Sequence, residues 1–408
     1  MKTKNAISSL LFVAVAFSLM LTSCKKDPEP LALVSLLSGI IDLNGATSPN
    51  NVPVSPTIVA VFNVDVDPAT ATATTITMVQ DYDDAAVPLT ITTSGKTITI
   101  VPQASLGTGA LYQLSFGAGL MSTDALAITP FQRTFTTEGT FAPAGAIAHF
   151  TFEDNANDII GPWDPAAADI IGITYTASRK AAAGKAATFN GATSIIEVPN
   201  GELLMNTNNF TMAFWMKTNS AEKTNNHFVM GLAGWNGFQY EVYGDYTGSK
   251  LAIQYQLATG TASEDMWFPS LADLGWQGWS YAKSLTVAEM TALLKDNWIN
   301  VVYTYNGATK VGTLYFNGQR MKAFDFNLWP AGDAKRGVTG MKYAGLAAGN
   351  KLALGFIQGR NNRTITDEWA DYSLPANNHF KGQLDDIRFW HKALSENEIL
   401  LMYNSEKP

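Results

Sequence analysis

The chain has 408 residues, a net charge of −8 and 15 % charged residues. That length is sufficient for two domains or more. A mildly acidic chain without a basic cluster argues against nucleic acid as a partner. The single cysteine excludes a disulfide within the chain, so stability must come from packed cores. The abundance of Gly, Thr, Asn, β-branched and aromatic residues is typical of strands and turns.

The N-terminus has the pattern of an exported lipoprotein. A basic start, Met1-Lys2-Thr3-Lys4, precedes an apolar run from Leu10 to Leu21. This run is too short to cross a bilayer, which takes ~20 apolar residues, but it suits a secretory signal. It ends in Leu21-Thr22-Ser23-Cys24, which resembles the lipobox at which signal peptidase cuts before a lipid-modified cysteine. We therefore predict a signal peptide over residues 1–23 and a lipid on Cys24 that attaches the chain to a membrane.

Residues 24–50 are predicted to be a lipidated spacer. Pro28, Pro30 and the charges around them suit a solvated segment, although the apolar stretch 31–37 is able to dock as a first strand. Lys25 follows the cysteine, which does not resemble the acidic inner-membrane retention signal. The short charged tail instead resembles the export tag of surface lipoproteins. We expect attachment to the outer membrane at the cell surface, and attachment facing the periplasm stays open.

Short alternating strands are predicted between residues 51 and 139, and about six strands in this length favour a β-sandwich. The predicted strands begin at Thr57, Thr75, Val87, Lys96, Leu111 and Gln132. The segment resembles the bacterial Ig-like domains found in tandem on surface proteins. The resemblance rests on Ser55-Pro56, Asp67-Pro68-Ala69-Thr70, Pro102, Leu106, Gly109, Tyr112 and Phe135-Thr136-Thr137. It implies a spacer, because no titratable cluster in this segment suggests chemistry.

A linker with Pro and Gly, residues 139–145, is predicted to separate this domain from a second domain over residues 146–408. All ten tryptophans lie beyond the linker, and this shift in composition supports the boundary. The second domain is again predicted to consist of strands and turns. Asn306-Gly307 and Asn317-Gly318 lie between alternating strands and are strong hairpin signals.

The second domain resembles the laminin-G-like, concanavalin A-like jelly roll of bacterial surface proteins. Six pieces occur in the family's order: 150–158, 187–191, 210–216, 298–302, 314–318 and 382–390. The main departure is an insertion over residues 257–297, in which a capping box at Thr286 and Glu289 opens a helix. A second capping box, at Ser395 and Glu398, opens a helix after the last strand. The predicted fold class is all-β: an Ig-like β-sandwich and a concanavalin A/laminin-G-like jelly roll with one short helical insertion.

No catalytic pattern is complete. The sequence lacks Gly-x-Ser-x-Gly, His-Glu-x-x-His and a phosphate-binding glycine loop, and its four histidines are scattered. Jelly rolls of this kind include glycan hydrolases, in which carboxylates alternate on one strand and face one cleft. Here Glu264-Asp265, Asp367-Glu368 and Asp385-Asp386 are adjacent pairs, whose side chains would point to opposite faces of a strand. None makes a dyad alone, although carboxylates from different strands can still meet, so we name no catalytic residue.

Calcium is the metal that the sequence suggests. Calcium takes six to eight oxygen ligands, mostly carboxylates and backbone carbonyls. Members of the resembling family often hold a structural Ca²⁺ where the first and last strands run together. The resemblance implies Glu153, Asp158 and Asp385 or Asp386 as ligands, with Asn155 and backbone oxygens filling the shell. The alternative is a solvated acidic turn and a polar strand end without a metal.

Carbohydrate is the ligand that the aromatic residues suggest, because sugars present apolar C–H faces to flat rings and hydroxyls to polar side chains. The candidate carbohydrate-binding residues are Trp235, Asn236, Trp267, Trp276, Trp279 and Tyr281. The last four belong to the insertion. The alternative is that these rings seal the insertion against the sheet, as other tryptophans are expected to fill the core.

We therefore predict a surface lipoprotein whose laminin-G-like domain, presented on an Ig-like spacer, binds a polysaccharide or other glycan through the 257–297 insertion without turnover. Two alternatives stay open: a glycan hydrolase or lyase of jelly-roll fold, and an adhesin that binds protein. The missing motif counts against an enzyme, and the loop aromatics favour a glycan over a protein.

Replacing Cys24 with Ala is expected to release the protein from membranes, because the lipid would have no attachment point. The measurement is the share of protein that pellets with membranes after a high-salt wash. A Cys24→Ala protein that still pellets like the wild type would contradict the lipoprotein prediction.

Overall fold

The computed structural model describes residues 28–269, 278–361 and 363–408. The chain forms two compact units. The first contains residues up to Gln80, 85–103 and Tyr112–Thr136; the second contains Thr137–Pro408 with the short segments 81–84 and 104–111. Cys24 and the predicted signal peptide lie outside the described residues. Within the described ranges, no helix combines the length and apolar character needed to cross a bilayer.

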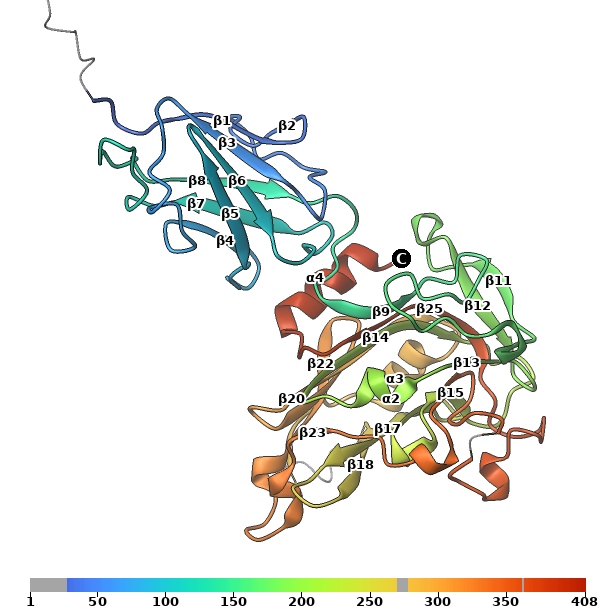
Figure 1. The fold of residues 1–408 in the computed structure, drawn as a ribbon. Coiled ribbons are helices and arrows are strands. Elements are labelled where there is room, and N and C mark those ends of the chain that lie inside the picture. Colours follow the sequence, from blue (N-terminus) through green and yellow to red (C-terminus); the bar gives the residue numbers. More distant parts are fainter. Residues whose placement is uncertain (1–27, 270–277, 362) are drawn as a thin grey trace, which may run out of the picture. The chain divides into compact units, whose positions relative to one another are not determined.

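The first unit is a β-sandwich of two antiparallel sheets, with strand orders β2-β1-β3-β6-β5 and β4-β7-β8 (Figure 1). Its strands are β1 (Leu33–Ser38), β2 (Ile41–Asp42), β3 (Ile58–Phe62), β4 (Ile76–Gln80), β5 (Leu89–Ser94), β6 (Thr97–Pro102), β7 (Leu111–Phe116) and β8 (Phe131–Thr136). Buried residues alternate with more accessible ones along β3 and β6, so one face of the sheet is apolar. Phe62 of one sheet meets Phe116 of the other edge-on at 6.2 Å. All six strands predicted between residues 51 and 139 are confirmed.

The segment 24–50, which was predicted to be spacer with an optional first strand, supplies β1 and β2. β1 pairs with β3 from Ser38 opposite Ile58 to Leu33 opposite Phe62. Leu36 is fully buried. The apolar stretch therefore docks because its inward side chains complete the core of the first unit.

The second unit contains two larger sheets that stack face to face (Figure 1). We name each sheet after one of its central strands. The β14 sheet has the order β11-β12-β25-β14-β20-β21-β22-β19, with β9 paired to β25. The β17 sheet has the order β10-β13-β24-β15-β16-β17-β18, with β23 paired to β17. The strands are β9 (Ala146–Phe150), β10 (Ile170–Ile171), β11 (Thr174–Ala177), β12 (Lys185–Asn190), β13 (Ile195–Val198), β14 (Asn209–Thr218), β15 (His227–Gly231), β16 (Phe238–Val242), β17 (Ser249–Gln256), β18 (Thr261–Phe268), β19 (Trp279–Ala282), β20 (Trp298–Asn306), β21 (Val311–Phe316), β22 (Gln319–Asp325), β23 (Gly340–Met341), β24 (Leu352–Leu354) and β25 (Lys381–Trp390).

Aromatic side chains fill the space between these two sheets. Phe214 on β14 meets Tyr240 on β16 edge-on, with ring centroids 5.4 Å apart. Phe210 on β14 lies 6.4 Å from Phe238 on β16. All four rings are buried, as expected of a sandwich core, so the inward positions of each strand are fixed by packing.

The predicted hairpin turns are confirmed. β20 and β21 pair around Asn306-Gly307, and β21 and β22 pair around Asn317-Gly318. Asn317 and Gly318 have φ values of 51° and 74°. Positive φ at both central residues gives a type I′ turn, whose twist matches that of the strands it joins.

The α-helices within the described residues are short: α2 (Gly201–Met205), α3 (Val287–Leu294) and α4 (Glu396–Glu406). Both predicted capping boxes are present, Thr286 with Glu289 before α3 and Ser395 with Glu398 before α4. Ile399 and Met402 of α4 pack on the outward face of the β14 sheet (Figure 1). The 3₁₀ helices are η1 (Ala167–Asp169), η2 (Ala181–Ala183), η3 (Gly234–Asn236), η4 (Phe326–Leu328), η5 (Ala334–Gly337), η6 (Leu346–Ala348) and η7 (Glu368–Ala370).

The predicted linker over residues 139–145 is attached to the second unit. The Trp390 indole N–H donates to the carbonyl of Pro143 at 3.3 Å. Phe141 packs against the cluster that contains Trp390 and Met402. The segment is therefore tied down at its C-terminal end by the same residues that hold α4.

Removing either cap is expected to lower stability, because the backbone N–H of Glu289 or Glu398 in the first turn of the helix loses its side-chain acceptor. Thr286→Ala and Ser395→Ala should each cost about 1 kcal/mol in the free energy of unfolding. The measurement is chemical denaturation of the full chain. Thr→Ser at position 286 keeps the hydroxyl and serves as the control; an equal loss in that variant would contradict the role of the cap.

Candidate functional site

The outward face of the β17 sheet carries a row of side chains that crosses four strands. Antiparallel register places Phe228 opposite Glu241, Glu241 opposite Lys250, and Lys250 opposite Trp267. The intervening residues on β16 to β18 point inward and are buried in the core. Since side chains alternate between faces along a strand, the members of this row share the outward face.

A second row runs beside the first. Gln239 lies opposite Ala252, and Ala252 lies opposite Asp265. The Gln239 amide N–H donates to Glu241 Oε2 at 2.8 Å, which links the two rows. We call the seven residues of both rows the outer-face strip: Phe228, Gln239, Glu241, Lys250, Ala252, Asp265 and Trp267.

Charges within the outer-face strip interact. Burial raises the pKa of Glu241, while Lys250 opposes that rise from 3.7 Å. Burial raises the pKa of Tyr243 above its ordinary value, and the nearby carboxylates of Glu241 and Asp265 add to this. Glu241 and Asp265, on strands two apart, therefore act on one region of the sheet face.

Two polar atoms near the outer-face strip are buried without a hydrogen-bond partner among the described residues: Gln239 Oε1 and the Tyr243 hydroxyl. Gln239 has no exposed surface. Unsatisfied buried groups are rare in folded proteins because each one costs free energy.

Exposed tryptophans stand at both ends of the outer-face strip. Trp267 is 51 % exposed. At the other end Trp369 meets Phe228 edge-on at 5.9 Å, and Trp235 lies 6.0 Å from Trp369 with the ring planes 31° apart. Trp235 and Trp369 are 37 % and 39 % exposed. The strip is thus a set of polar groups between accessible aromatic rings.

Local backbone geometry places Trp235 on the surface. Ala233 and Gly234 both have positive φ, 52° and 60°, so the chain reverses directly after β15 and η3 begins. A Cβ atom on Gly234 would lie 2.2 Å from Ile365 Cδ1. Only glycine therefore lets η3 pack against the loop that carries Trp369.

Of the residues predicted from the sequence to bind carbohydrate, Trp235, Asn236 and Trp267 lie in or beside this region, and its other members were not predicted. Asn236 is half-buried on η3, and its carbonyl accepts from the Ala344 N–H at 2.7 Å. The missed signal is the alternation in 238–242, where Gln239 and Glu241 interrupt three large apolar residues. Trp369 carries no comparable signal, because it lies in a loop far from β15 in sequence.

The other candidate residues of the insertion lie elsewhere. Trp279 was predicted to bind carbohydrate, but it is buried in the core, edge-on to Phe324 at 4.6 Å, with the Lys322 ammonium 3.7 Å from its ring centroid. It offers no open face to a sugar. The ring of Tyr281 is covered by the Arg320 guanidinium at 4.1 Å. Trp276 lies outside the described residues.

Three of the predicted calcium ligands, Asp158, Glu153 and Asn155, already accept hydrogen bonds from backbone N–H groups. Asp158 accepts from the N–H groups of His149, Ile160 and Gly161 at 2.6 to 3.1 Å. The Glu153 carboxylate accepts from the Lys185 N–H at 3.1 Å. Asn155 Oδ1 accepts from the Asn157 N–H at 2.9 Å. These oxygens shape a turn.

Asp385 and Asp386 bind the same arginine, and here the expectation that adjacent carboxylates diverge is wrong. Arg179 donates to Asp385 Oδ2 and to Asp386 Oδ2, both at 2.5 Å. The pairing of β25 with β14 shifts at this point, and Asp386 has a φ of 46°. This β-bulge turns the second carboxylate to the side of the first.

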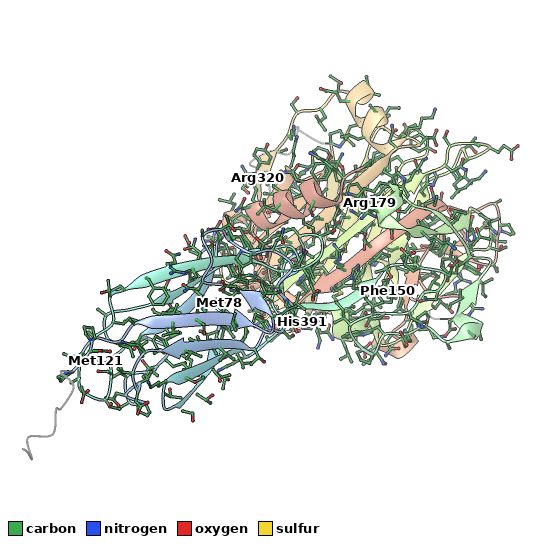
Figure 2. All side chains as sticks on the ribbon, turned by 90° about the horizontal axis from the view of Figure 1, so that it is seen from above. Met78, Met121, Phe150, Arg179, Arg320 and His391 are labelled. Atoms are coloured by element: carbon green, nitrogen blue, oxygen red, sulfur yellow. The ribbon has the colours of Figure 1, made fainter. Side chains whose placement is uncertain are left out.

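The two aspartates belong to a buried ion network on the outward face of the β14 sheet. Arg388 pairs with Glu406 of α4 and, at 3.0 Å, with Asp386. Arg179 also donates to the Glu406 carbonyl at 2.9 Å, and Figure 2 shows it close to the C-terminal helix. Burial alone would raise the pKa of Asp386, but Arg388 and His149 hold it well below its ordinary value. The network fixes the end of α4 to β25.

The five calcium candidates do not form a metal shell in this arrangement, because arginine and backbone N–H groups hold their oxygens. Among the described residues, no group of three or more His, Cys, Asp or Glu side chains is arranged to bind a metal ion. Calcium binding stays a prediction of the sequence.

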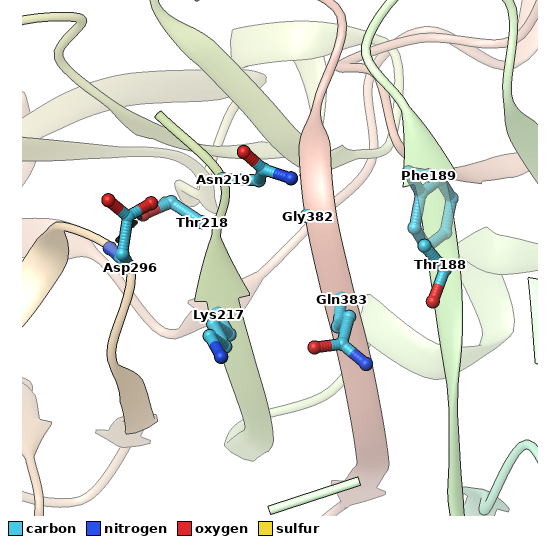
Figure 3. A pocket seen from close by; sticks show the side chains of 8 residues that line it. All are labelled: Thr188, Phe189, Lys217, Thr218, Asn219, Asp296, Gly382 and Gln383. Carbon is cyan, nitrogen blue, oxygen red and sulfur yellow. Dashed lines mark hydrogen bonds between the residues drawn. The ribbon is translucent and has the colours of Figure 1, made fainter. Parts of the chain in front are cut away.

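A separate pocket of about 330 Å³ lies at the ends of three adjacent strands of the β14 sheet, β12, β25 and β14 (Figure 3). Three of its polar side chains already have partners: Asp296 binds Ser220, Gln383 binds Thr176, and Thr218 binds the Leu294 carbonyl. The pocket is lined by Thr188, Phe189, Lys217, Thr218, Asn219, Asp296, Gly382 and Gln383. It presents no accessible aromatic ring, so it is less suited to a sugar than the outer-face strip.

The two sandwiches match two known families of β-domain. Residues 39–137 match the model of the bacterial Ig-like domain. Residues 190–357 match the model of the concanavalin A-like lectin/glucanases superfamily. The chain therefore consists of a bacterial Ig-like domain followed by a laminin-G-like, concanavalin A-like domain, as the resemblance implied. No curated protein sequence matches the chain.

Several solved structures are similar to part of the chain at low identity. The binding domain of Paraclostridial Mosquitocidal Protein 1 is 16 % identical, with a TM-score of 0.41 over 64 % of this chain and 52 % of that chain. The botulinum neurotoxin serotype D ligand binding domain, in complex with N-acetylneuraminic acid, is 13 % identical, with a TM-score of 0.40 over 64 % and 51 %. Domain 4 of AbnA, a GH43 arabinanase from Geobacillus stearothermophilus in complex with arabinotriose, is 17 % identical, with a TM-score of 0.37 over 64 % and 99 %. The match thus spans about half the length of each toxin chain.

The ion network predicts a stability change that depends on pH. Because the folded-state pKa of Asp386 is lowered, its ionised form stabilises the fold fully above the ordinary pKa of 3.8, and this contribution declines progressively as pH falls from 3.8 towards the folded-state pKa. Asp386→Asn should cost roughly 3 kcal/mol at pH 7, and the difference from the wild type should shrink towards pH 3.

Thermal unfolding of the full chain between pH 3 and 7, with and without EDTA, measures this effect. Asp154→Asn, which removes only an exposed pair with Lys185, is the control and should change little. If Asp386→Asn is less stable than the wild type only in the absence of EDTA, the result would favour bound calcium over the arginine network as the cause.

Proposed function

We propose that the concanavalin A-like domain binds a glycan on the outer-face strip, with Trp235 and Trp369 at one end and Trp267 at the other. The observation that carries this proposal is the pair of accessible indoles, with ring centroids 6.0 Å apart, beside a strip of carboxylate, amide and ammonium groups. Accessible aromatic rings flanked by fixed polar groups suit a ligand with both C–H faces and hydroxyls.

Each part of the strip has a role in this proposal. The indole faces stack on sugar rings, and Glu241 and Asp265 accept hydrogen bonds from hydroxyls. Gln239 and Lys250 both contact Glu241, at 2.8 and 3.7 Å, and so hold its carboxylate in place before a ligand arrives. Preorganised groups lose little conformational entropy on binding.

The proposal moves the site from the insertion to the sheet face. Of the four insertion aromatics, Trp267 alone is both described and well exposed. Trp267 lies on β18 and faces outward with Lys250, whose ammonium is 5.7 Å from its ring centroid. The strip therefore keeps one predicted residue from the insertion and combines it with Trp235, which comes from η3.

Attachment by lipid on Cys24 would present this domain at the outer membrane, with the Ig-like domain as a spacer. Two or three stacked rings give only modest affinity for one segment of glycan. A repeating polymer bound by many membrane-attached copies gains avidity without new contacts. A lipid-anchored binding protein is therefore suited to a polysaccharide.

Removing both indoles is expected to weaken glycan binding without unfolding the protein. Each stacked ring contributes ~1 kcal/mol, so Trp235→Ala/Trp369→Ala should weaken binding by roughly 30-fold. The measurement is retardation in gels loaded with single polysaccharides, with circular dichroism as the check of folding.

Tyr281→Ala is the matched control, because Tyr281 belongs to the insertion but lies on β19 in the other sheet. It should bind like the wild type. Loss of binding in Tyr281→Ala together with normal binding in the double variant would return the site to the insertion. Release of reducing sugar by the pure protein would replace the binding function with hydrolysis.

A further inference from the structure

We infer that the outer-face strip selects glycans without acidic groups. The inference rests on the proposed function and adds the class of glycan to it. It comes from the balance of charges, and of hydrogen-bond donors and acceptors, on this face of the sheet.

The first observation is the balance of charge. The outer-face strip contains two carboxylates, Glu241 and Asp265, and one ammonium, Lys250. Lys250 lies 3.7 Å from Glu241 and is matched to it. In the described part of the chain, no cation lies within salt-bridge distance of Asp265. The strip therefore presents one uncompensated negative charge.

Arg363, in the loop that carries Trp369, adds no free cation to this balance, because it pairs with Asp371 at 2.9 Å. The same loop contains two further carboxylates, Asp367 and Glu368. A carboxylate or sulfate on a bound sugar would meet like charges at both places.

The second observation is the balance of donors and acceptors. The Gln239 amide N–H is used on Glu241, and the Gln239 side chain has no exposed surface, so it offers no group to a ligand. The carboxylates of Glu241 and Asp265 are acceptors. A sugar hydroxyl supplies the donors that these oxygens require, whereas an ionised acid group has none to offer.

The neighbouring residue Glu264 shows that the effect belongs to one face of β18. Glu264 lies opposite Ile253, whose side chain is in the core, and it pairs with Lys335 of η5. Asp265, the next residue, lies on the outward face opposite Ala252. Substituting either carboxylate changes the net charge of the protein equally, but only Asp265 belongs to the strip.

The experiment compares neutral polysaccharides with their acidic derivatives on the intact protein. Retardation is measured in gels loaded with laminarin, dextran, arabinan or hydroxyethylcellulose, and in gels loaded with the carboxymethylated form of each polymer. The wild type is expected to bind at least one neutral polymer at least about tenfold more tightly than its carboxymethylated form. The ratio should fall as salt rises, because screening weakens the repulsion.

Asp265→Asn should reduce this ratio to about threefold or less, while Glu264→Gln should leave it unchanged. Both variants are checked for folding by thermal unfolding. Equal retardation by a neutral polymer and its acidic form overturns the inference and leaves the proposed function intact. Tighter binding of acidic polymers also overturns it. Absence of retardation by every polymer overturns the proposed function and the inference together.

Discussion

The cross-strand register of the β17 sheet is the constraint on which the candidate site depends. Packing against the β14 sheet fixes Phe238, Tyr240 and Leu251 inward, and all three are buried. Because side chains alternate, the residues between them must face outward in register. A shift of one residue would exchange the two faces of a strand. The buried aromatic core therefore aligns Glu241 with Lys250, although it has no contact with a ligand itself.

A second constraint acts on the opposite side of the sandwich, where α4 closes the β14 sheet. Arg179, Arg388 and two aspartates are buried together with Glu406, so their charges are stable only as a set. The outward faces of the two sheets in this domain therefore differ in how they carry charged residues. One sheet buries its outward charges under a helix, whereas the other leaves Lys250 and Asp265 partly exposed beside Trp267.

Much of the fold followed from the sequence, because strands, Asn-Gly turns and capping boxes are local patterns. The site did not, because its members meet only through pairing of distant segments. Asp385 and Asp386 show the limit most clearly: alternation predicted that they diverge, and a bulge in β25 brought both to Arg179. Trp279 shows another limit, since a Gly-flanked tryptophan in an insertion has the same local pattern whether it is buried or exposed.

Gln239 connects the fold to the proposed binding. Its side chain is buried to position Glu241, and this burial leaves Oε1 without a donor. An unsatisfied buried acceptor costs about 1–3 kcal/mol, which the free protein bears. Because the whole side chain is enclosed, a ligand meets the carboxylate that Gln239 positions and not Gln239 itself. The cost of burying Gln239 is therefore borne for the orientation of Glu241, which links the packing of the sheet to the geometry of the proposed site.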